Sequence, residues 1–106
     1  MQHKKIAASL FSALKSGKAL TPITETHPGI SIDDAYKISL AFLDLRVVKN
    51  NEKIVGKKIG VTSKAVQDML GVFQPDFGFL TDGMAVLDGR VNVDCLISPR
   101  AEAEIA

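Results

Sequence analysis

The sequence has few of the residues that mark specialised classes of protein. Cys95 is the only cysteine among 106 residues, which excludes an internal disulfide and leaves no cysteine–histidine spacing for a zinc site. Tryptophan is absent and aromatic residues make up only 6% of the chain, too few for a surface that stacks nucleic-acid bases. A chain without disulfides suits a reducing compartment, and we expect the cytoplasm.

An excess of charge of one sign is also missing. The sequence has thirteen basic and twelve acidic residues, so its formal charge is +1. This gives no field that would attract nucleic acid or an anionic membrane. No apolar run approaches the roughly 18 to 20 residues that span a bilayer, and the first residues lack the pattern of a signal peptide. We therefore expect neither nucleic acid nor membrane as a partner.

Two helical patterns fill residues 1–50. Gly17 is suited to end the first helix. Ser31 followed by Asp34 is typical of a capped helix start, and that second helix should run to about Val48. The apolar stripes of the two helices are Ile6, Leu10, Phe11 and Leu14, then Ala35, Ile38, Phe42 and Leu45.

The pattern changes at Ile54, and residues 54–106 read as mostly β. Asp88-Gly89 favours the tight turn of a β-hairpin. The expected class is therefore α+β: two N-terminal helices followed by short strands and a β-hairpin. The expected segments are a strand at 54–61, a short helix at 64–70, a loop at 74–78, strands at 79–80 and 84–87, and the hairpin turn at 87–90.

Two carboxylates stand in an alternating run at the end of the sequence. If Arg100–Ala106 is a strand, Glu102 and Glu104 point to the same face, where they repel one another unless a cation lies between them. Hard ions such as Mg²⁺ or Mn²⁺ prefer such oxygen ligands. A solvated acidic face would give the same pattern, so the spacing alone leaves both interpretations open.

Lys58 and Asp76 are the other candidates for chemistry. Lys58 lies between glycines on the predicted strand, where its side chain could enter a cleft and meet an anionic substrate. Asp76 follows Pro75, at a place where aspartate often serves only to bond its own turn. An ordinary surface lysine and an ordinary turn aspartate remain alternatives to a site.

Three stretches together are more specific than any of these residues alone. They are IVGKKIGVTSKAVQ from Ile54, GVFQPDFGFLTD from Gly71 and LISPRAEAEIA from Leu96. In combination they resemble the 2-hydroxypenta-2,4-dienoate (2-keto-4-pentenoate) hydratases of aromatic meta-cleavage catabolism. This group also includes 4-oxalocrotonate decarboxylases and is related to the fumarylacetoacetate hydrolase superfamily.

The resemblance implies an N-terminal portion of a fumarylacetoacetase-like fold, with the β-barrel core and a third carboxylate ligand expected beyond residue 106. It implies that Glu102 and Glu104 bind Mg²⁺ or Mn²⁺, and that Lys58 and Asp76 are catalytic. The expected substrate is a small enol or 2-oxo acid, hydrated by a homo-oligomeric lyase. The alternatives are a 2-oxo-acid decarboxylase, or a truncated module that is not catalytic; the 106 residues alone are expected to be inactive.

Overall fold

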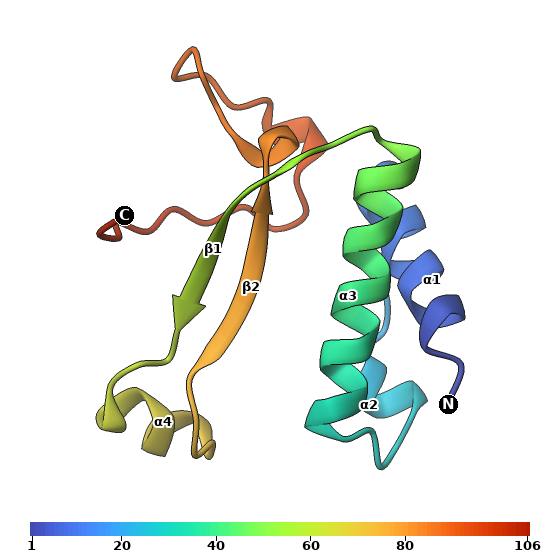
Figure 1. Cartoon of the computed structure of the whole chain (residues 1–106), viewed down its shortest axis with the longest axis vertical. Coiled ribbons are helices and arrows are strands. Elements are labelled where there is room, and N and C mark those ends of the chain that lie inside the picture. Colours follow the sequence, from blue (N-terminus) through green and yellow to red (C-terminus); the bar gives the residue numbers. More distant parts are fainter. The chain divides into compact units, whose positions relative to one another are not determined.

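The computed structural model describes all 106 residues, which form two compact units. Unit 1 comprises Met1–Leu45 and Val86–Ala106, and unit 2 comprises Arg46–Ala85. The elements are α1 (His3–Ser16), α2 (Ile23–Thr26), α3 (Ile32–Lys49), β1 (Ile54–Gly60), α4 (Lys64–Leu70), β2 (Asp76–Thr81), and the 3-10 turns η1 (Asp82–Met84) and η2 (Val93–Cys95) (Figure 1). Helices with one two-stranded antiparallel sheet confirm the predicted α+β class.

The core of unit 1 lies between α1 and α3, which run side by side in Figure 1. Ile6 and Ala7 of α1 and Ile38 of α3 are buried, and Phe11 meets Phe42 edge to face at 6.2 Å between ring centroids. Most of each predicted apolar stripe therefore faces a common core, whereas Leu14 at the end of the first stripe is exposed. None of the helices has the length and apolar character needed to cross a membrane.

The helix ends follow from single residues. Gly17 adopts the left-handed conformation that ends α1, as predicted. Before α3, the Ser31 hydroxyl accepts from the Asp34 backbone N–H at 3.1 Å, and the Ser31 N–H donates to the Asp34 carboxylate at 3.2 Å. His3 bonds the same carboxylate at 2.7 Å and so links α1 to α3. The Ser31 hydroxyl also donates to this carboxylate, at 2.6 Å. That hydrogen bond first, and the one from His3 second, lower the pKa of Asp34.

Unit 2 is an antiparallel pair of strands connected by α4. Ile54 pairs with Thr81 at one end and Gly60 pairs with Asp76 at the other, with a bulge between Ile54 and Gly56. The predicted helix at 64–70 is confirmed with the same bounds. Ser63 caps it by accepting from the Val66 N–H, and Gly71 ends it in the left-handed conformation.

Several predictions for the second half of the chain are wrong. The loop expected at 74–78 gives way to β2 from Asp76 onward, because Pro75 cannot donate to the ladder but the residue after it can. No strand forms at 84–87. Asp88 and Gly89 do form a turn, in which Gly89 has a φ of 71° and the Arg90 N–H donates to the Asp88 carboxylate.

That turn is not flanked by strands, so the predicted hairpin is absent. An isolated two-stranded hairpin is marginal unless one of its faces packs on a core. The flanking apolar side chains have no such packing, since Leu87 is 95% exposed and Val91 is 55% exposed. From Ala85 to Ala106 the chain is largely irregular, and β structure is limited to β1 and β2.

Candidate active site

One face of the β1–β2 sheet carries both Lys58 and Asp76. Lys58 lies opposite Gly78, and Asp76 lies opposite Gly60, so the lysine and the aspartate occupy diagonal positions on paired strands. Residues directly opposite in an antiparallel pair share a face, and diagonal neighbours lie within reach of a long side chain. The structure thus brings together the two residues that the sequence offered as catalytic candidates.

A small cavity lies at this place in unit 2. Its volume is about 200 Å³, and Lys58, Gly60 and residues 76–80 line it. Pockets for drug-sized ligands measure roughly 300 to 1,000 Å³, so this cavity suits a small molecule or one part of a larger one. A lysine and a carboxylate at one cavity supply a positive charge and a group able to accept or deliver a proton.

Lys57 occupies the opposite face of the sheet. It pairs with Phe79, and its ammonium lies 6.0 Å from the centroid of that ring. Alternation along the strand therefore separates two neighbouring lysines, one over an aromatic ring and one at the cavity.

Glu52 fixes the end of the sheet away from the cavity, and no sequence pattern predicts this role. Its carboxylate accepts hydrogen bonds from Arg46 at 2.8 and 3.0 Å, from Asn50 at 3.1 Å and from Thr81 at 2.7 Å. Burial of the carboxyl opposes ionisation, but the bonds from Thr81, Arg46 and Asn50 outweigh it and lower the pKa of Glu52. Arg46 precedes Glu52 by six residues in α3, whereas Thr81 comes from β2, so only the folded chain assembles the cluster.

Glu102 and Glu104 lie in a segment that contradicts the predicted strand. Residues 100–106 are irregular and exposed in unit 1, and no strand pairs with them. Strand alternation therefore does not place the two carboxylates on one face. No group of three or more His, Cys, Asp or Glu side chains is placed to hold a metal ion anywhere in the chain. Carboxylate oxygens suit a hard divalent ion, but the structure brings no third such side chain to these two.

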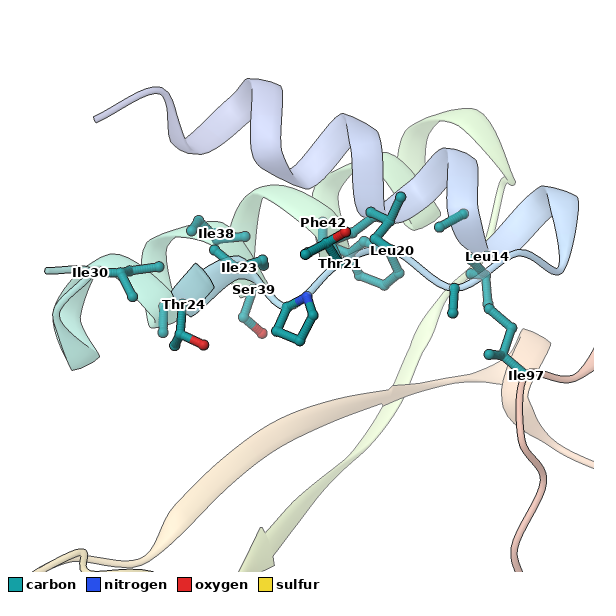
Figure 2. Close-up of a pocket in the computed structure, with 15 residues that line it drawn as sticks. Leu14, Leu20, Thr21, Ile23, Thr24, Ile30, Ile38, Ser39, Phe42 and Ile97 are labelled. Carbon is teal, nitrogen blue, oxygen red and sulfur yellow. The ribbon is translucent and has the colours of Figure 1, made fainter. Parts of the chain in front are cut away.

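A larger hollow in unit 1 is not a candidate for catalysis. It measures about 680 Å³ and lies among α1, the connector around Pro22 and α3, with Ile97 near Leu14 at one end (Figure 2). Its walls are apolar apart from Thr21, Thr24 and Ser39, and none of its lining side chains is ionisable. Acid–base chemistry needs an ionisable group, so the smaller cavity beside Lys58 is the better candidate.

Comparison with known proteins gives sequence relatives and similar solved structures, although no family model matches the chain. A 2-hydroxyhexa-2,4-dienoate hydratase of Comamonas testosteroni is 55% identical over 100 residues, which is 92% of this chain and 38% of the relative. A 2-hydroxypent-2,4-dienoate hydratase of Pseudomonas putida is 49% identical over 104 residues, or 96% of this chain and 46% of the relative.

Two solved structures of a 4-oxalocrotonate decarboxylase from Pseudomonas putida G7 share the fold. The one with calcium and acetate matches with a TM-score of 0.82, and the one with magnesium and adipate with a TM-score of 0.80. Both are 32% identical and cover 91% of this chain, but only 37% and 36% of the decarboxylase chain. The match supports the predicted fumarylacetoacetase-like relationship.

The chain spans about two fifths of the length of the hydratases it matches. Identity of 41% to 55% with several proteins named as 2-hydroxydienoate or 2-keto-4-pentenoate hydratases confirms the resemblance seen in the sequence. Over that length, the chain is a relative of the 2-hydroxypentadienoate (2-keto-4-pentenoate) hydratases.

Proposed function

We propose that this chain contributes the Lys58–Asp76 wall of the active site in a divalent-metal-dependent hydratase. The substrate would be 2-hydroxypenta-2,4-dienoate and the product 4-hydroxy-2-oxopentanoate, a step of aromatic meta-cleavage catabolism. The observation that carries the proposal is the placement of Lys58 and Asp76 on one sheet face, at one cavity, in a chain 55% identical to a dienoate hydratase. The remaining walls would come from a longer polypeptide, of which these residues form the N-terminal portion.

The proposed reaction consists of two proton movements and one addition of water. The enol loses its hydroxyl proton while C5 gains a proton, which leaves a conjugated 2-oxo-3-enoate. Water then adds, with its oxygen bonding to C4 and a proton bonding to C3. The sum is one substrate plus one water, with no oxidant or reductant required.

In this scheme Lys58 and Asp76 have different tasks. The ammonium of Lys58 binds the substrate carboxylate or the developing enolate, so that positive charge lies where negative charge grows. The carboxylate of Asp76 moves the proton or orients the attacking water. This division follows from residue type, and their diagonal placement on paired strands supports a shared ligand, because one molecule in the cavity can lie against both.

Glu102 and Glu104 are the proposed ligands of Mg²⁺ or Mn²⁺. Their oxygen donors suit a hard ion, and the related decarboxylase is known with calcium and with magnesium. When bound, such an ion acts as a Lewis acid toward the 2-oxo acid. Two carboxylates leave most of the coordination shell unfilled, so a third protein ligand outside these 106 residues is part of the proposal. A cytoplasmic homo-oligomer remains the expected state.

A second candidate is decarboxylation of a vinylogous 2-oxo acid. It is favoured by the structural match to the 4-oxalocrotonate decarboxylase at a TM-score of 0.82. Sequence identity is higher to the hydratases, at 55% against 32%, and this supports hydration as the first choice.

A chimera tests the proposal by supplying the remaining walls of the site from a related hydratase. Residues 1–106 would replace the matching segment of the Comamonas testosteroni hydratase, and the purified protein would receive 2-hydroxypentadienoate or 4-oxalocrotonate with Mg²⁺. We expect water addition to the first and little release of CO₂ from the second. Release of CO₂ without hydration would favour the decarboxylase, and inactivity toward both, in a folded chimera, would favour a non-catalytic module.

A further inference from the structure

The sheet face that carries Lys58 and Asp76 is made largely of glycine. The register places six residues on it in three opposed pairs: Gly56 with Leu80, Lys58 with Gly78, and Gly60 with Asp76. Glycine inside a strand loses conformational entropy on folding and contributes no side chain to packing. Three glycines among six positions therefore require a reason other than the stability of the sheet.

The backbone does not require these glycines. Positive φ angles occur at Gly17, Gly29, Gly71 and Gly89, and at none of the strand glycines. Any residue could adopt the extended conformation found at Gly60 and Gly78.

Packing within the chain does not require them either. A Cβ added at Gly60 or at Gly78 would meet no atom within 4 Å. At Gly56 a Cβ would lie in ordinary contact with Leu80, at 3.8 Å. Gly60 and Gly78 line the cavity beside Lys58 and Asp76, whereas Gly56 does not. Gly60 and Gly78, which neither the backbone conformation nor packing within the chain requires to be glycine, are therefore the two at the cavity.

We propose that Gly60 and Gly78 determine specificity by forming a flat floor for a planar, conjugated carboxylic acid. The inference rests on the proposed function in one respect, namely that Lys58 binds the carboxylate of that acid. A flat chain of conjugated carbons can lie directly against the glycine backbone. An alanine methyl at either position would project roughly one carbon–carbon bond, about 1.5 Å, into the layer that the ligand occupies.

The test uses the 106-residue chain, labelled with ¹⁵N and titrated by NMR with sorbate (hexa-2,4-dienoate), a stable planar dienoate. Hexanoate serves as its flexible, saturated counterpart. We expect sorbate to bind more tightly than hexanoate and to shift amide signals of β1 and β2. Gly60→Ala and Gly78→Ala should weaken sorbate binding about tenfold, which corresponds to the low end of overpacking a close contact. Gly56→Ala, on the same face but outside the cavity, is the matched control and should bind as the parent chain does.

Stability distinguishes a ligand floor from a structural need for glycine. Because a Cβ at Gly60 or Gly78 has space in this chain, the thermal midpoints of both alanine variants should equal or exceed that of the parent. A thermal midpoint lowered in either variant would overturn the proposal that Gly60 and Gly78 form a ligand floor. Unchanged sorbate binding in both variants would overturn it as well. So would a parent chain in which sorbate shifts no signal of the sheet.

Lys58→Met separates this inference from the proposed function. If Lys58→Met binds neither sorbate nor hexanoate, and the alanine variants no longer bind sorbate, both the glycine floor and the carboxylate-binding role of Lys58 are supported. If Lys58→Met loses both acids while the alanine variants bind normally, the floor is wrong and the role of Lys58 stands. If only the alanine variants lose sorbate, the floor stands and the carboxylate has another partner.

Discussion

Replacing Glu52 with alanine should remove a large fraction of the stability of the unit that carries Lys58 and Asp76. The Glu52 carboxylate is 9% exposed and accepts four hydrogen bonds, two of them from Arg46, whose side chain is 12% exposed. Removing one member of a buried charge pair typically costs about 3–5 kcal/mol. A chain of this size has a total stability of roughly 5–15 kcal/mol, so the loss is a large fraction of it.

The expected result is a fall in the thermal midpoint of about 12 °C or more, at about 4 °C or more for each kcal/mol. Urea unfolding followed by far-ultraviolet circular dichroism gives the free energy, and hydrogen exchange of the β1 and β2 amides shows whether the loss falls in unit 2. Thr81→Val is the graded control, because it removes one of the four bonds and should cost about 1 kcal/mol. A Glu52→Ala chain within 1 kcal/mol of the parent would refute the view that this cluster fixes the sheet.

Three further predictions follow from the other charged residues. In the chimera, Glu102→Gln or Glu104→Gln should abolish Mg²⁺-dependent hydration with the fold intact by circular dichroism, and unchanged turnover would exclude the residue as a ligand. The pKa of Asp34 is lowered in the folded chain, so ionised Asp34 stabilises the fold. This contribution is complete above about pH 4 and is lost on further acidification. Asp34→Asn should therefore be less stable at pH 7 and should lose less stability in acid than the parent, as urea unfolding at several pH values would show. The 106-residue chain alone should bind Mg²⁺ weakly by calorimetry and add no water to 2-hydroxypentadienoate, and measurable turnover would show that the pocket needs nothing more.

Local signals predicted the helices well because each depends on neighbouring residues. Gly17 and Gly71 end helices where their freedom to adopt positive φ is used, and Ser31 and Ser63 begin helices by bonding N–H groups of the first turn. Strand β1 was also predicted from its β-branched residues. At the helix ends the determining contact lies within a few positions in the sequence, whereas β1 also depends on its pairing with β2.

The features that sequence reasoning missed depend on distant partners. The run from Arg100 to Ala106 alternates like a strand, but alternation creates no strand without a neighbour to accept its hydrogen bonds. The Asp88-Gly89 turn forms without its hairpin for the same reason. The cluster around Glu52 joins residues 29 positions apart, and no periodicity within the chain marks it.

The most direct test of the catalytic pair is a double-mutant cycle in the chimera with Lys58→Met and Asp76→Asn. Each single variant should lower kcat by about 10² or more, the scale for one lost electrostatic contact in a transition state. If both groups act on one substrate, the double variant should be about as slow as the slower single variant, because residues that act as a unit are not additive. Lys57→Met, on the opposite face, should keep nearly full activity. Full hydration rates in Lys58→Met or Asp76→Asn, or a larger loss in Lys57→Met than in Lys58→Met, would contradict the assignment of this sheet face as the active site.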